Sequence, residues 1–168
     1  MRDQKRCVIV ITLILAATGL FVWWRQANQT VLRVRDFKTQ QIYNEVPVSP
    51  GDHLFFGWMH SLEHIPWNEE FHITKAHTLM LDEISFPAFG AGIPENKGKR
   101  TWVDKTGMIH MAEIGQDFPY LDWINSHYAT REIKVNETVV TTGKQLPEHR
   151  RLLLRIEKKG FLNGYGKE

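Results

Sequence analysis

The chain has 168 residues, with 21 Lys or Arg against 19 Asp or Glu, and its formal net charge is +2 when the 8 His are neutral. This near balance argues against a nucleic-acid-binding protein with a broad basic surface, so we expect no nucleic-acid partner. The only cysteine, Cys7, excludes an intramolecular disulfide framework. A folded domain must therefore be held by its own apolar core.

The N-terminal segment from Cys7 to Trp24, CVIVITLILAATGLFVWW, carries no charge. Its length approaches the roughly 20 apolar residues that a helix needs to cross a bilayer core. A basic cluster precedes it, and Trp23 and Trp24 end it where indoles favour the headgroup region. The segment predicts a single-pass anchor in the cell membrane, with an N-terminus in the cytoplasm and an extracytoplasmic C-terminal domain.

A cleaved signal peptide is the alternative interpretation of this segment. Ala17-Thr18-Gly19 would supply a small-x-small cleavage site. We favour the anchor because the apolar run continues to Trp24, beyond the usual length of a signal peptide. The expected organisation is a membrane anchor or uncleaved signal at 1–25, a membrane-proximal segment with the first strand at 26–46, and an extracytoplasmic β domain at 47–168.

Short β-strands separated by turns are expected after the anchor. Val31–Arg35 alternates apolar and charged residues, as a half-buried strand does. Gly107 and the pair Asn136-Glu137 indicate two tight hairpins. Residues 117–127 would contain a helical turn. The other expected strands are 54–59, 71–74, 78–84, 101–104, 108–111, 131–135, 138–141 and 151–157. This pattern predicts an all-β fold, a small antiparallel sandwich or a partly open barrel.

Polar groups that could form a pocket are concentrated between His60 and Glu70, where eleven residues hold two imidazoles, a hydroxyl and three carboxylates. A glycine-rich loop then follows at 89–92, and its bare backbone N–H groups could hold an anion. The two carboxylates Glu63 and Glu69 would accept from a ligand amine or pair with Arg100 or Arg131. The predicted ligand-binding residues are His60, Ser61, Glu63, Glu69, Phe89, Gly90, Ala91 and Gly92, with Trp58 and Trp67 as apolar walls.

Two chemical alternatives use the same residues. A hydrolase would take Ser61 as nucleophile, His60 as base and Glu63 as its partner, but adjacent residues on one segment rarely reach triad geometry. The histidines and Glu69 could instead ligate zinc, although their spacing fits no zinc signature. We therefore predict no catalytic residue, no metal site and no cofactor. Under a purely structural interpretation, Gly90 and Gly92 only permit a tight bend before Pro94.

The two motifs together resemble the DUF1850 family over about residues 46 to 160. The first motif is Trp58-Met59-His60-Ser61-Leu62-Glu63, followed by Pro66 and then Glu69-Glu70-Phe71, and the second is Phe89-Gly90-Ala91-Gly92-Ile93-Pro94. The family consists of small bacterial extracytoplasmic proteins of unassigned function, and the resemblance supplies no catalytic residues. Its members are often encoded beside tripartite (TRAP) transporters of the TAXI type, so the resemblance implies an accessory role in transport.

Two functions are therefore expected. The first is a membrane-anchored extracytoplasmic accessory or small-ligand-binding protein that serves a TRAP/TAXI solute transporter and takes a small anionic or amine ligand. The second is an extracytoplasmic hydrolase or metal-dependent enzyme built on the segment His60-Ser61-Leu62-Glu63. A third interpretation, in which the motifs serve only folding, stays open.

Overall fold

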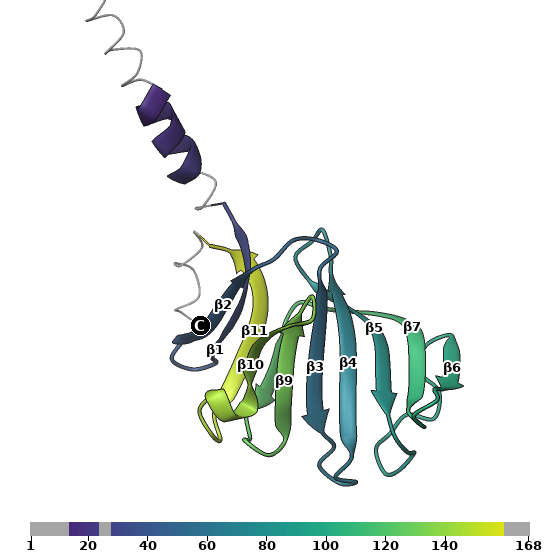
Figure 1. Cartoon of the computed structure of the whole chain (residues 1–168). Coiled ribbons are helices and arrows are strands. Elements are labelled where there is room, and N and C mark those ends of the chain that lie inside the picture. Colours follow the sequence, from purple (N-terminus) through teal and green to yellow (C-terminus); the bar gives the residue numbers. More distant parts are fainter. Residues whose placement is uncertain (1–13, 24–27, 160–168) are drawn as a thin grey trace, which may run out of the picture. The chain divides into compact units, whose positions relative to one another are not determined.

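The computed structural model describes residues 14–23 and 28–159. The chain divides into two compact units, Met1–Thr30 with Lys158–Glu168 and Val31–Glu157. In the first unit, residues 14–23 form a helix (Figure 1). Within the described ranges, no helix combines the length and the apolar character needed to span a membrane. The predicted anchor from Cys7 to Trp24 lies partly outside these ranges, at 7–13 and 24.

Antiparallel strands dominate the rest of the described chain. They are β1 (Thr30–Asp36), β2 (Ile42–Pro47), β3 (His53–Met59), β4 (Pro66–Ile73), β5 (Leu79–Phe86), β6 (Arg100–Val103), β7 (Ile109–Phe118), β8 (Leu121–Ile124), β9 (Thr130–Val135), β10 (Thr138–Thr142) and β11 (Arg151–Lys158), with a short 3₁₀ helix, η1 (Gly143–Gln145), before the last strand. The prediction of an all-β antiparallel fold is confirmed.

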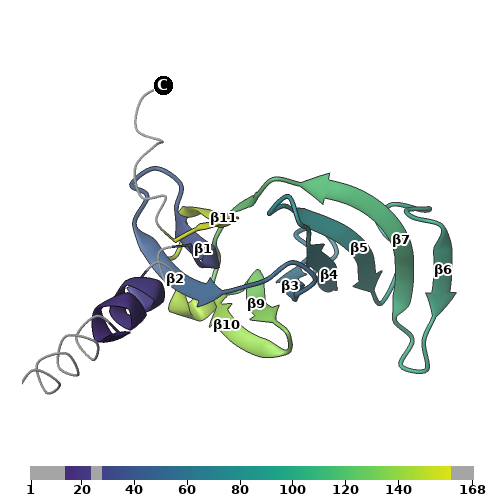
Figure 2. The same ribbon diagram turned by 90° about the horizontal axis from the view of Figure 1, so that it is seen from above.

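The strands form two separate sheets and no closed barrel in the described chain. The small sheet has the order β2-β1-β11-β8, and the large sheet has the order β10-β9-β3-β4-β5-β7-β6. Figure 2 shows the large sheet curving from β9 round to β6. Register shifts in β3–β9 at Gly57/Trp58, in β4–β5 at Glu70/Phe71 and in β5–β7 at Leu81/Glu83 accompany this curve. Such bulges bend a strand and increase its twist.

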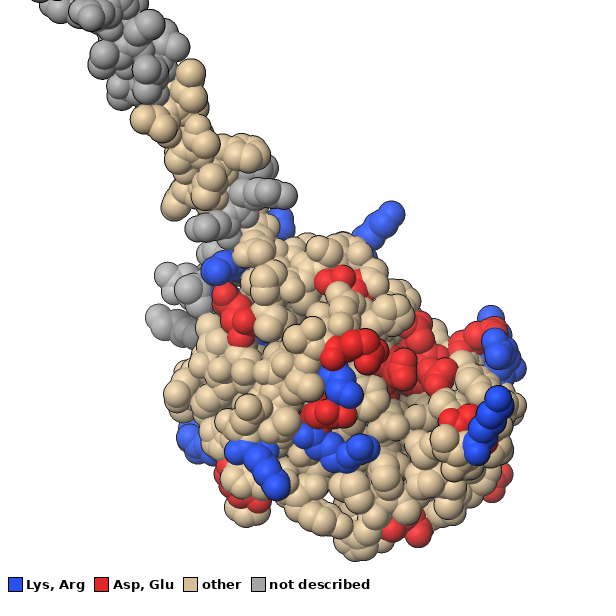
Figure 3. All heavy atoms as spheres, viewed as in Figure 1, with Lys and Arg blue, Asp and Glu red and all other residues tan. Residues whose placement is uncertain are grey.

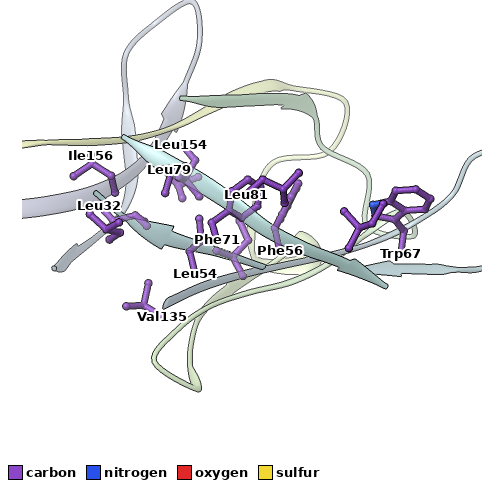
Figure 4. Close-up of a cluster of buried hydrophobic side chains, with 14 of the residues drawn as sticks. Leu32, Leu54, Phe56, Trp67, Phe71, Leu79, Leu81, Val135, Leu154 and Ile156 are labelled. Carbon is purple, nitrogen blue, oxygen red and sulfur yellow. The ribbon is translucent and has the colours of Figure 1, made fainter. Parts of the chain in front are cut away.

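The two sheets share one apolar core. The small sheet contributes alternating residues of β11, Leu152, Leu154 and Ile156, while the large sheet contributes Leu54 and Phe71 among others. Burying each such side chain stabilises the fold by about 1.5–3 kcal/mol. In Figure 4 the leucine and isoleucine side chains of both sheets lie together, and Trp67 lies at the opposite end of the cluster. The core therefore reaches beyond the small sheet along β4.

A buried charge network connects the strands of the small sheet. Arg33 on β1 is only 1% exposed. Its Nε lies 2.7 Å from Glu45 Oε2 on β2, and its Nη1 lies 2.9 Å from Glu157 Oε1 on β11. Arg35 also pairs with Glu157. A buried guanidinium with two carboxylate partners fixes the register of β2, β1 and β11, because a shift of one residue would turn it to the other face.

Several strand boundaries differ from the sequence predictions. The turns at Gly107 (φ 89°) and at Asn136-Glu137 (φ 47° and 65°) are confirmed. The strand expected to start at Phe71 starts at Pro66. The prediction missed its first residues because a carboxylate at an inward position, Glu69, hides the alternation of apolar and polar side chains. The helical turn expected in 117–127 is wrong. That segment holds the polar end of β7, which is largely exposed, and strand β8.

Candidate functional site

The loop between β3 and β4 is closed by its own backbone around His60. The His60 N–H donates to the Ile65 carbonyl at 2.8 Å, and the His64 N–H donates to the His60 carbonyl at 2.9 Å. The His60 imidazole is buried, and its centroid lies 5.8 Å from those of Trp58 and Trp67. Its Nδ1 accepts from the Glu63 N–H at 3.4 Å. These contacts make His60 the centre of the loop.

The glycine-rich segment folds into a turn that lies directly against this loop. The Ile93 N–H donates to the Gly90 carbonyl at 3.2 Å, and Gly92 has a φ of 79°, as the third residue of a type II turn does. The Ala91 N–H donates to Glu63 Oε1 at 2.8 Å. A Cβ on Gly90 would lie 2.5 Å from Glu63 Cδ, so this approach requires glycine. The structure thus brings the two distant motifs into contact.

The Glu63 carboxylate binds the Ala91 N–H, one of the backbone groups that the sequence analysis predicts would hold an anionic ligand. On the other side of the turn, a Cβ on Gly92 would lie 3.7 Å from His60 Nε2. Phe89 is exposed, but its ring meets Phe86 edge-on at 5.5 Å. Phe86 in turn stacks on Trp67 at 5.0 Å. His60, Glu63 and Phe89 to Gly92 therefore form one group, which we call the motif cluster.

Ser61 and the two predicted arginines take no part in the motif cluster. Ser61 is exposed, and its hydroxyl has no hydrogen bond to any described residue. Neither predicted arginine pairs with Glu63 or Glu69, since Arg131 bonds Asn68 and Arg100 lies 3.9 Å from Glu113. Across residues 14–23 and 28–159, no group of three or more His, Cys, Asp or Glu is placed to hold a metal ion.

Glu69 projects from the inner face of β4, in a position where the pattern of the strand calls for an apolar side chain. It lies between the buried residues Trp67 and Phe71, opposite Phe56 on β3 and Ile84 on β5. Trp67 Nε1 donates to Glu69 Oε1 at 3.2 Å. The early start of β4 at Pro66 is what turns this carboxylate inward.

Burial raises the pKa of Glu69 above its ordinary value, because it disfavours the charged carboxylate. Hydrogen bonds from the indoles of Trp67 and Trp58, together with the charge of Lys97, lower that pKa but do not cancel the effect of burial. Glu69 forms no ion pair with any residue in the described ranges. It is a recessed carboxylate whose charge is only partly compensated.

Glu69 opens into a cavity of about 380 Å³ between the inner face of the large sheet and β8. Its walls are largely aromatic, with Phe56, Trp58, Phe118, Tyr120 and Trp123 among the lining residues. No Lys, Arg or His is among those residues. Sequence reasoning missed the β8 side of this cavity, although the three aromatic residues within 118–123 were a usable signal. The segment was interpreted as a helical turn instead.

Trp58 connects the cavity with the motif cluster. Its indole lines the cavity, packs on Trp67 at 5.5 Å, and stacks on the His60 ring. The predicted site residues therefore fall into two neighbouring groups with a shared aromatic wall. Glu69 belongs to the cavity, and His60, Glu63 and the glycine turn support the wall from behind.

The outer face of the large sheet carries a different set of charges. Glu70 follows Glu69 on β4 and faces outward, where it lies opposite Glu83 of β5. Acidic side chains gather on the face of the molecule seen in Figure 3. The pKa of Glu70 is raised by partial burial and by repulsion from Glu83. This neighbouring carboxylate does not line the cavity, so it is a natural control for Glu69.

One comparison with known proteins identifies the family. The family model described as a domain of unknown function (DUF1850) matches residues 55–141, just over half of the chain. No curated protein and no solved structure matches the chain. The matched range contains both motifs, Glu69 and all the residues that line the cavity. The chain belongs to the DUF1850 family.

Proposed function

We propose that this protein is a small-ligand-binding protein whose site is the cavity around Glu69. The observation that carries the proposal is a carboxylate at an inward strand position, open to a cavity of about 380 Å³ and without an ion-pair partner in the described chain. Cavities that hold small molecules have volumes of about 300–1,000 Å³ and are mostly apolar, with a few well-placed polar groups. The aromatic walls and Glu69 fit that description.

A purely structural role does not account for Glu69. Burial of a carboxylate destabilises a fold unless hydrogen bonds or opposite charges compensate. At Glu69 the two indole N–H groups compensate only in part, since the pKa stays raised. A glutamine would accept the same hydrogen bond from Trp67 without a charge. Carboxylates in cavities whose pKa is raised by burial are found at many functional sites, where stability is given up for binding.

The motif cluster would act as the support of this site. The Glu63–Ala91 hydrogen bond joins the β3–β4 loop to the glycine turn, and His60 packs against Trp58 and Trp67. Both indoles contact Glu69 or its surroundings. In this proposal His60, Glu63 and the glycines position the cavity wall, and no reaction is assigned to them.

The wider setting is also part of the proposal. The uncharged run from Cys7 to Trp24 and its basic flank support a single-pass anchor with the β domain, a small antiparallel sandwich, outside the cytoplasm. An accessory role beside a TRAP/TAXI solute transporter is supported by the family resemblance. Fractionation of cells that express the tagged full chain tests the location. Recovery of the chain in the soluble cytoplasmic fraction would contradict it.

Ligand binding is tested with the purified full-length chain and a panel of small solutes that covers cations, anions, sugars and neutral aromatic compounds. A solute that binds only the folded protein raises Tm, because it stabilises the folded state by RT ln(1 + [L]/Kd). We expect at least one class to raise the Tm of the wild type and not of Ala129→Leu, because Ala129 lines the cavity and a larger side chain would fill it. Failure of every class, or equal shifts in the variant, would overturn the proposal.

A further inference from the structure

We infer that the cavity takes a small organic cation, an alkylammonium group held by Glu69 and enclosed by aromatic rings. This inference rests on the proposed function and names the class of ligand. Three features of the cavity carry it: the nature of its walls, the sign of its charges and the absence of a basic residue from its lining.

The first feature is the aromatic lining. Rings from three strands and one connecting segment line the space, with Phe56 and Trp58 from β3, Phe118 from β7, Trp123 from β8 and Tyr120 between β7 and β8. Phe56 and Trp123 approach to 5.2 Å with their planes inclined by 57°. Aromatic faces carry negative electrostatic potential and attract ammonium groups, most strongly when water is excluded. Such a lining favours a cation over a neutral group of equal size.

The second feature is the charge balance of the lining. The carboxylates of Glu69 and Asp122 are the only acidic side chains among the lining residues. Asp122 already accepts from Arg151, with its Oδ2 2.7 Å from Arg151 Nε. Glu69 has no such partner in the described chain, and Lys97, which acts on it through its charge, is not among the lining residues. Glu69 is therefore the charge that a cationic ligand would neutralise.

The remaining ligand classes fit less well. An anion would bring a second negative charge to a recessed carboxylate without a guanidinium or ammonium among the lining residues to receive it. A neutral ligand would displace water from Glu69 and leave its burial less compensated than before. A cation reverses both penalties, because its charge is neutralised by Glu69 and its alkyl groups contact the rings.

The experiment is isothermal titration of the full-length chain with two matched sets of probes. Tetramethylammonium, tert-butanol and pivalate share a compact methyl-covered shape and differ in charge. Butylammonium, butanol and butyrate do the same for a primary amine. We expect the cation of at least one set to bind at least about tenfold more tightly than its neutral and anionic counterparts, a difference of about 1.4 kcal/mol.

Two variants locate the effect. Glu69→Gln should weaken the binding of the cation at least about tenfold and leave the neutral probe unaffected. Glu70→Gln, on the outward face of the same strand, should bind the cation as the wild type does. A cation that binds Glu69→Gln and the wild type equally would overturn the inference.

The outcomes separate this inference from the proposed function. Equal binding of the cation and its neutral counterpart, or preference for the anion, overturns the cation inference while the cavity stays a binding site. The same holds when neither cation binds but another solute class stabilises the wild type and not Ala129→Leu. If no solute class binds at all, both the inference and the proposed function fall.

Discussion

Arg33 and Glu69 are both charged side chains that β-strands hold away from solvent, yet their surroundings differ. Arg33 is enclosed by Glu45 and Glu157 at hydrogen-bonding distance, and the three residues connect three strands of the small sheet. Glu69 has two indoles around it, no ion-pair partner in the described ranges, and a cavity in front of it. The comparison teaches that a buried charge stabilises the fold when oppositely charged partners neutralise it. A buried charge without such partners, beside a cavity, indicates a binding site.

The largest expected change in stability follows from breaking the ion pairs of Arg33. Glu157→Gln removes one of the carboxylates that compensate Arg33 and Arg35, so we expect the free energy of unfolding to fall by about 3 kcal/mol. Urea denaturation measures this loss. The control is Glu132→Gln, whose pair with Lys134 is more exposed and should contribute no more than about 1 kcal/mol. Equal effects of the two substitutions would remove the distinction between a buried network and a surface pair.

Removal of the unpaired charge of Glu69 should instead stabilise the fold. Glu69→Gln should raise the free energy of unfolding of the ligand-free protein by about 1 kcal/mol at about pH 7. The raised pKa of Glu69 means that its ionisation destabilises the fold as pH rises from its ordinary value of 4.5 through its raised value. The gain should therefore vanish at about pH 4, where the carboxyl is protonated in both states. A loss of stability in the variant would make Glu69 a structural residue.

Loss of the support of the cavity wall should change stability by no more than removal of the Glu69 charge does. Gly90→Ala should displace the Glu63 side chain and break its hydrogen bond to Ala91, which costs about 1 kcal/mol. Because both changes remove the same bond, Gly90→Ala combined with Glu63→Ala should cost little more than Glu63→Ala alone. Thermal denaturation of the three variants completes this cycle. Simple additivity would show that Gly90 and Glu63 act independently.

The smallest effect concerns His110, which lies outside the cavity. Burial alone would lower the pKa of His110, but Glu83 and Asp104 on either side of the imidazole raise it above its ordinary value of 6.5. The stabilisation from the charged ring is present below pH 6.5 and is lost as pH rises through the raised value. Replacing His110 with Gln should remove about 1 kcal/mol or less of pH-dependent stability in urea denaturation.

The control for this prediction is His149→Gln, since His149 is exposed and, among the described residues, pairs only with Glu148. An unchanged pH profile in the His110 variant would contradict the role of the two carboxylates.

Much of the fold follows from local signals, and the cavity does not. Gly107 and Asn136 indicate turns in the sequence, because glycine and asparagine adopt a positive φ more easily than other residues. Both hairpins are confirmed. The residue types predicted that the two motifs would share one site, but not that Glu63 itself would accept from the Ala91 N–H. For the β8 wall, the three aromatic residues within 118–123 indicate that large rings gather there, but not where those rings lie. Trp123 meets Phe56 only through the packing of two sheets, and no local pattern in 118–123 encodes that distance.

The tryptophans around Glu69 have a practical consequence. Trp58, Trp67 and Trp123, three of the six in the chain, lie on the cavity or directly against its carboxylate. Indole emission responds to nearby charge and to contact with water, so protonation of Glu69 or arrival of a ligand should alter the fluorescence of the unmodified protein. The molecule carries its own optical reporter, and occupancy can be followed in solution without a label.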